Sequence, residues 1–250
     1  MRPPLRIAIL ECDTPIESVD ERYNGYYGLF SQLFRECAKS LGLDPEADLD
    51  ITRWDVVHAQ EYPRLEDVDA IVQTGSKYDS FESDPWILKL VEYTKTALKD
   101  NRVKLLGICF GHQIIGRSLG VKVGRSDAGW EIAVCDVDLT DQAKKLFGKD
   151  KLRIHQMHRD VVHSCPPNVI PLGSSPKCAL QGMYLPGKLI TVQGHPEYNG
   201  FIVTEIVNKR TRDGVFSKEM SDDALARAEL EHDGLDILGI FLQFLLGEVV

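Results

Sequence analysis

Short apolar runs alternate with amphipathic segments through the first half of the chain. The runs that predict buried strands lie at 5–10, 51–57, 70–74 and 103–109. Apolar residues recur with the spacing of a helix in the segments 26–41, 84–98 and 112–119. Gly42 ends the first of these helices, and Asp84 is placed to cap the second before Pro85. The alternation predicts an α/β fold with an open, mostly parallel central sheet and helices on both faces.

The second half of the chain has a different pattern. Short strands and turns over 121–192, with one short helix at 141–147, predict an antiparallel extension at the edge of the sheet. The run 189–193 predicts a last core strand, and helices at 198–212 and 221–246 are expected to follow it. No repeat or linker divides the sequence. We therefore expect one domain over 1–250, with a core at about 5–200 and a C-terminal helical extension at about 200–250.

Composition narrows the class of protein. With 43% hydrophobic and 27% charged residues, the chain can bury a large core. The 38 acidic and 29 basic residues give a net charge of -9, which argues against nucleic acid as a partner. The longest apolar run, 237–246, is too short to span a membrane, and the N-terminal run is too short for a signal peptide. Six scattered cysteines without a C-x-x-C pair predict a cytoplasmic protein. The oligomeric state stays open.

The clearest candidate for chemistry is Cys109, which lies between Gly107 and Gly111 in the order Gly107-Ile108-Cys109-Phe110-Gly111. This is a cysteine version of the G-x-S-x-G nucleophile elbow, in which a strand turns abruptly into a helix and small flanking residues avoid a clash. The helix N-terminus favours the thiolate form. The N–H of Phe110 is placed to stabilise an oxyanion. The simpler alternative is a tight turn with a buried cysteine.

Two further motifs follow predicted strands. His195 and Glu197 point the same way from an extended chain around Pro196, so the acid can orient the imidazole as an acid-base catalyst requires. By itself this pair is more often an incidental ion pair, but Cys109 supplies the nucleophile that it lacks. Gly75 and Ser76 end another strand and offer a second oxyanion donor, or an ordinary glycine turn. Specificity is expected in the loops after Asp13, Ser76 and Gly124.

These motifs resemble the class I, triad-type glutamine amidotransferase family, whose fold is flavodoxin-like. The resemblance covers 5–200 and includes Gln113 after the cysteine motif, Gly194 before the histidine motif and a Met157-His158-Arg159-Asp160 stretch. It implies that Cys109 attacks a γ-glutamyl carbonyl to form a thioester. It also implies that Gln113, Trp130 and Glu131 hold the glutamine side of the substrate and that Gly75, Ser76 and Phe110 form the oxyanion site. His158, from the stretch 157–160, is a further candidate for substrate binding. No cofactor or metal is implied.

The sequence departs from relatives that consume ammonia in synthesis. It has neither a G-x-x-x-x-G-K-S/T loop nor an S-G-G-x-D-S loop. It is similar to the stand-alone branch that includes plant γ-glutamyl peptidases and uncharacterised fungal amidotransferase-like proteins. Three hypotheses follow. The protein hydrolyses glutamine, with a separate ammonia-accepting synthetase as a candidate partner, or it is a peptidase that acts on glutathione or its conjugates. The third is a non-catalytic binding or redox-sensing relative. A metal site at His155, His158, His163 and Cys165 is not expected, because 155 and 158 face opposite sides of a strand.

Overall fold

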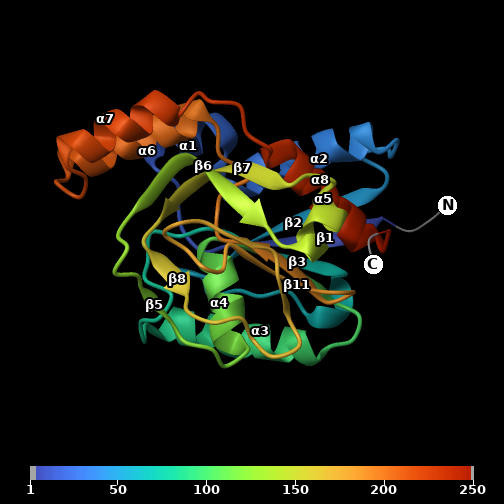
Figure 1. The fold of residues 1–250 in the computed structure, drawn as a ribbon. Helices are drawn as coiled ribbons and strands as arrows, with labels where there is room; N and C mark the ends of the chain where they lie inside the picture. Colours follow the sequence, from blue (N-terminus) through green and yellow to red (C-terminus); the bar gives the residue numbers. More distant parts are fainter. Residues whose placement is uncertain (1–3, 249–250) are drawn as a thin grey trace.

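Seven strands form the central sheet of the computed structural model, which describes residues 4–248 (Figure 1). In spatial order they are β2 (Leu49–Asp55), β1 (Leu5–Glu11), β3 (Ala70–Gln73), β4 (Lys104–Ile108), β12 (Leu189–Val192), β11 (Gly182–Leu185) and β9 (Ile170–Pro171). The first five pair in parallel, and the last two are added antiparallel. The predicted parallel sheet with an antiparallel edge extension is therefore confirmed.

Helices cover both faces of this sheet, as Figure 1 shows. Successive side chains of a strand point to opposite faces, so Ile7 and Ile9 of β1 pack in one hydrophobic cluster with Phe30, while Ala8 and Leu10 pack in the other. The first cluster takes most of its helical residues from α2 (Gly25–Ser40) and α8 (Gly234–Leu246), and the second takes its helical residues from α3 (Pro85–Lys99) and α4 (Phe110–Ser118). The two-sided burial explains why the core strands read as continuous apolar runs.

Residues 121–192 depart in part from the predicted edge extension. Besides the core strand β12, only β9 and β11 of this stretch join the central sheet, and the other strands form two small antiparallel sheets. One contains β10 (Gly173–Ser174), β6 (Glu131–Leu139) and β7 (Lys151–His158), and the other contains β5 (Val123–Arg125) and β8 (Asp160–Val162). The reason is that β6 and β7 pair with each other along eight residue pairs, which satisfies their backbones away from the sheet edge. The short helix α5 (Asp141–Phe147) forms where it was predicted. The structure also contains α1 (Glu17–Tyr23) and a 3₁₀ turn at Leu65–Asp67, which were not predicted.

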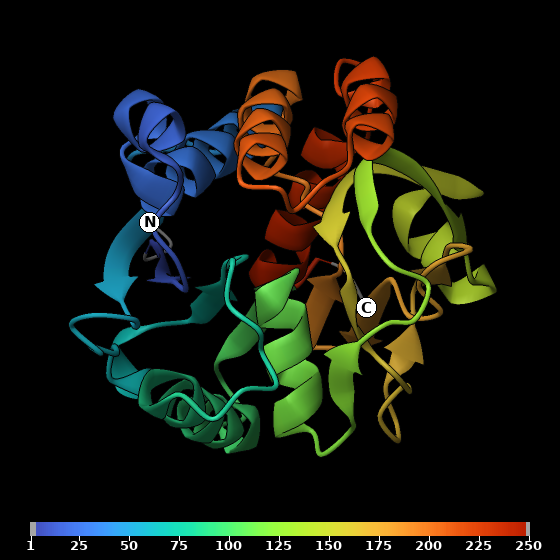
Figure 2. The ribbon, with the colours of Figure 1, turned by 90° about the vertical axis from the view of Figure 1, so that its left-hand side faces the viewer.

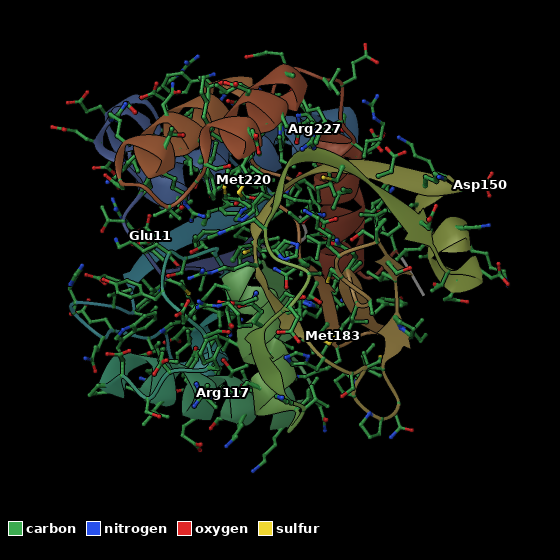
Figure 3. All side chains as sticks on the ribbon, turned by 60° about the vertical axis from the view of Figure 1, so that its left-hand side comes forward. Glu11, Arg117, Asp150, Met183, Met220 and Arg227 are labelled. Atoms are coloured by element: carbon green, nitrogen blue, oxygen red, sulfur yellow. The ribbon has the colours of Figure 1, made fainter. Side chains whose placement is uncertain are left out.

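The prediction of one helix over 221–246 was wrong. After α6 (Gly200–Arg212), the chain forms α7 (Lys218–Arg227) and then breaks before α8. Asp233 fixes the break against β7, because its carboxylate accepts the Arg153 N–H at 2.6 Å and its own N–H donates to the Arg153 carbonyl at 2.7 Å. Arg227 of α7 donates to backbone carbonyls of β6, so α7 lies over β6 and beside α6 (Figures 2 and 3).

The most apolar helix of the molecule is α8. Its residues Ile237, Leu238 and Phe241 are fully buried against the first cluster, so the apolar run serves the core. Across residues 4–248, no helix has both the length and the apolar composition that a bilayer crossing requires.

Candidate active site

Cys109 occupies a strained turn between β4 and α4. Its backbone has φ 50° and ψ -99°, a region that residues other than glycine rarely adopt. A Cβ on Gly111 would lie 2.3 Å from the Gln73 carbonyl oxygen, and one on Gly107 would lie 2.9 Å from the Gly111 backbone. The Cys109 N–H donates to the Val192 carbonyl at 2.9 Å. The two glycines thus allow β4 to turn directly into α4 with the cysteine at the carboxyl edge of the sheet.

His195 lies beside Cys109 because β12 and β4 are parallel neighbours that end at the same edge. Its Nδ1 is 2.8 Å from Oε1 of Glu197, and both side chains are almost fully buried. Burial lowers the pKa of His195, but the Glu197 carboxylate and the charge and hydrogen bond of Cys109 outweigh it and raise the pKa to about 10. The imidazole therefore contacts both a buried acid and the thiol.

The loop after β3 contacts the other side of the imidazole. A Cβ on Gly75 would lie 2.6 Å from Cε1 of His195, so only glycine leaves room for the ring. The preceding residue, Thr74, fixes the loop: its hydroxyl accepts the Cys12 N–H at 2.9 Å, and its carbonyl accepts the Gly111 N–H at 3.2 Å. Ser76 is half-buried, and its hydroxyl accepts the N–H of Tyr78 within the loop.

Backbone donors are available at this edge of the sheet. Within the described chain, no acceptor takes the N–H of Phe110, the first residue of α4, or the N–H of Gly75. Both amides belong to segments that flank Cys109 and His195. The start of a helix also carries a partial positive charge, so an oxygen that becomes negative beside Cys109 would be stabilised there.

Three of the residues that were expected to hold the substrate form hydrogen bonds with other groups of the protein instead. The Gln113 amide donates to the Asp160 carbonyl at 2.9 Å and to Gln193 at 3.1 Å, and its oxygen accepts from Ser80 at 2.8 Å. His158 Nε2 and Glu131 are 3.1 Å apart, in register across β6 and β7. Gln113 thus connects α4 with β8 and with the end of β12, whereas His158 and Glu131 connect β7 with β6. Trp130 instead carries two guanidinium groups over its ring, those of Arg159 at 5.1 Å and Arg210 at 4.6 Å.

The loops in which specificity was expected are joined to one another. The Lys77 ammonium is 2.6 Å from the Asp13 carboxylate, which connects the loops after β1 and β3. Arg125 of β5 reaches Asp79 at 2.8 Å and Asp160 at 2.7 Å. These charged contacts place the loops after Asp13, Ser76 and Gly124 around one edge of the sheet.

Sequence reasoning missed two tyrosines at this site. The ring of Tyr198 stacks on the His195 imidazole, with centroids 3.9 Å apart and planes 10° from parallel. Its hydroxyl bonds to that of Tyr26, and burial raises the pKa of both phenols. Tyr198 follows Glu197 directly in the chain, so an aromatic residue next to the His-x-Glu pair was the signal that could have revealed it.

The other chemical candidates are placed elsewhere. Cys12 is fully buried, and burial raises the pKa of its thiol to about 12, so it is chemically quiet. In the part of the chain that the structure describes, no three His, Cys, Asp or Glu side chains are grouped as metal ligands. His155 instead packs against His232 with ring centroids 4.6 Å apart.

Comparisons with known proteins identify the family of the chain. The sequence model described as glutamine amidotransferase class-I matches residues 26–202. A glutamine amidotransferase-like protein of Schizosaccharomyces pombe is 34% identical over 253 residues, which cover 96% of this chain and 98% of that protein. Gamma-glutamyl peptidase 2 of Arabidopsis thaliana is 33% identical over 213 residues, covering 82% and 80%.

A solved structure, a glutamine amidotransferase from Thermotoga maritima, superposes with a TM-score of 0.76 at 23% identity, over 98% of this chain and 99% of that one. This likeness shows the shared fold. The matched family model and the sequence relatives go further: the chain belongs to the class-I glutamine amidotransferase family.

Proposed function

We propose that this protein is a cysteine-dependent hydrolase of γ-glutamyl amide bonds, with Cys109 as nucleophile, His195 as general acid and base, and Glu197 as the group that orients His195. The observation that carries the proposal is the position of one imidazole, which lies 2.8 Å from the Glu197 carboxylate and interacts with the thiol of Cys109. A nucleophile, a base and an orienting acid in this order are what covalent catalysis needs.

In the proposed reaction, the Cys109 sulfur attacks the γ-carbonyl carbon as an ion pair with the His195 imidazolium. The carbonyl oxygen becomes an oxyanion, which the N–H groups of Phe110 and Gly75 are placed to stabilise. His195 then gives its proton to the leaving nitrogen, and the C–N bond breaks to leave a γ-glutamyl thioester. Water, deprotonated by His195, attacks the thioester and releases glutamate and the free thiol.

The low exposure of the site supports this chemistry. The His195 and Glu197 side chains are 2% and 0% exposed, and Cys109 is 5% exposed. Charge interactions are stronger where water is excluded, so the His195 imidazolium of the ion pair gains more from Glu197 than it would at the surface. The strained backbone of Cys109 also favours catalysis over the non-catalytic alternative, because a binding protein has no need of that strain.

The substrate class remains part of the proposal. Relatives named gamma-glutamyl peptidases, 31–33% identical to this chain, favour a γ-glutamyl peptide such as glutathione or its conjugates over free glutamine. If glutamine is the substrate, an ammonia-accepting synthetase would be the partner. We also propose that the protein acts in the cytoplasm and that residues 1–250 form a single domain, as the sequence predicts.

The test is turnover of the pure protein. We expect release of glutamate from glutathione, from its S-conjugates or from glutamine, and none from the Cys109→Ser variant. The assay should be sensitive enough to detect a turnover of about one per minute per protein molecule. If none of the three substrates is then hydrolysed, the non-catalytic alternative is favoured. Turnover by Cys109→Ser at the wild-type rate would move the reaction to another part of the molecule.

A further inference from the structure

Two arginines share one indole ring at the junction of β6, β7 and α6. The Arg210 guanidinium lies 4.6 Å from the Trp130 ring centroid, and that of Arg159 lies 5.1 Å from it. Phe216 completes the wall, with its ring 5.1 Å from that of Trp130 and 5.5 Å from Arg210. A planar guanidinium held against aromatic rings keeps its N–H groups in a fixed direction.

This pair has no counter-ion. Nη1 of Arg210 is buried and has no hydrogen-bond partner, and within residues 4–248 no carboxylate pairs with either guanidinium. The chain carries nine more acids than bases, and other arginines form ion pairs throughout the molecule. Two like charges with a buried unpaired N–H are unfavourable unless a ligand supplies the missing acceptor.

Electrostatics connects the pair with the proposed nucleophile. Burial lowers the pKa of Arg210, and Arg159 lowers it further, whereas the negative forms of Tyr198, Cys109 and Tyr26 act in the opposite direction. The geometry makes the same connection: the His155 carbonyl of β7 accepts the His195 N–H at 2.7 Å, Arg159 directly follows the last residue of β7, and Tyr198 stacks on His195. Arg210 also lies beyond residue 202, where the stretch that matches the family ends.

We propose that Arg210, together with Arg159 across the Trp130 ring, binds a carboxylate of the substrate while Cys109 attacks its γ-carbonyl. The inference rests on the proposed function for the identity of the substrate. A γ-glutamyl peptide carries two such groups: the α-carboxylate of the glutamyl residue, and the C-terminal carboxylate, which in glutathione is two residues, at most about 7 Å of extended chain, beyond the scissile bond. The guanidinium fork matches either of them.

The test compares Arg210→Gln with Arg212→Gln, which removes the same charge from an exposed position on the same helix. We expect Arg210→Gln to raise KM by about 10- to 100-fold with kcat close to wild type, because the lost contact is made in both the ground state and the transition state. Arg212→Gln should have wild-type constants. Equal KM values for the two variants would overturn the proposal.

Four substrates identify the carboxylate. If it is the C-terminal one, Arg210→Gln should impair glutathione but neither glutamine nor the glycine ethyl ester of glutathione. If it is the α-carboxylate, all three should be impaired, and only the α-amide of glutathione should escape. An equal effect on all four substrates would overturn the proposal, because it would show a structural role. If Arg210→Gln does not fold, Arg159→Gln is measured on the same substrates.

A binding assay separates this inference from the proposed function. Glutathione binding to Cys109→Ser is measured by calorimetry and compared with binding to Cys109→Ser/Arg210→Gln. If the wild type shows no turnover but the double variant binds glutathione with a 10- to 100-fold weaker Kd, the carboxylate site is supported and the hydrolase is rejected. If the wild type turns over substrate but the two Kd values are equal, the hydrolase is supported and the carboxylate site is rejected.

Discussion

Replacing Gly75 with alanine tests whether the position of the His195 ring controls the chemistry. The added Cβ would lie 2.6 Å from Cε1, and ordinary contact begins at 3.4 Å, so the ring must retreat by about 0.8 Å. It cannot retreat freely, because Tyr198 stacks on it at 3.9 Å and Glu197 holds Nδ1 at 2.8 Å. A misplacement of about 1 Å lowers a rate by roughly 100-fold, which corresponds to about 2.7 kcal/mol in the transition state.

The assay is kcat for γ-glutamyl hydrolysis, with thermal unfolding measured in parallel. Gly75 does not have a positive φ, so alanine strains no backbone there, and overpacking should lower stability by only about 1–3 kcal/mol. Gly239→Ala is the matched control, since a Cβ at that helical position meets nothing within 4 Å and should be neutral or stabilising. Wild-type kcat in a folded Gly75→Ala protein would refute the reasoning.

Three other perturbations address the same side chains. Glu197→Gln should reduce kcat by up to about 10⁴-fold, because the amide favours the wrong tautomer of His195; unchanged kcat would remove Glu197 from the mechanism. Tyr198→Leu should reduce kcat/KM by roughly 10-fold through a looser imidazole, with Tyr198→Phe as the control that keeps the stacked ring; equal effects of both would assign the loss to the hydroxyl. Because the pKa of His195 is raised, its protonated form should contribute at most about 5 kcal/mol to the free energy of unfolding. This contribution is complete below pH 6.5 and is lost as the pH rises through about 10. Denaturant titrations between pH 6 and 10 should show this slope in the wild type and a smaller one in Glu197→Gln, and parallel slopes would contradict the pairing.

The fold was predictable where local pattern and burial agree. The parallel strands are buried on both faces and therefore appear as apolar runs. Gly42, with a φ of 75°, follows the end of α2, and α3 begins at Pro85 as predicted, although the Asp84 side chain makes no capping hydrogen bond. The break at 228–233 was not predictable in this way. The Asp233-Gly234 pair is a local turn signal, but the position of the break also depends on contacts of Asp233 with Arg153, 80 residues away in the chain.

The candidate site follows the same division. Cys109, His195 and Glu197 could be singled out as candidates because strained turns and strand ends require particular residues at fixed spacing. Tyr198 and Arg210 were missed because their significance comes from partners that only folding brings together, a histidine ring in one case and an indole in the other. Gln113 was expected to face the substrate, but its amide bonds within the protein, which spacing alone could not reveal.

The most direct test of the account is the identity of the atom that carries the γ-glutamyl group during turnover. The protein is mixed with a γ-glutamyl substrate, quenched in acid within milliseconds to seconds, digested and analysed by mass spectrometry. Peptide-level assignment matters because Cys135 and Cys165 are also partly exposed. We predict one glutamyl group on the Cys109 peptide, absent from Cys109→Ser. The central claim would be contradicted if hydrolysis continued with the adduct on another residue, or if the Cys109→Ser variant hydrolysed the substrate at the wild-type rate.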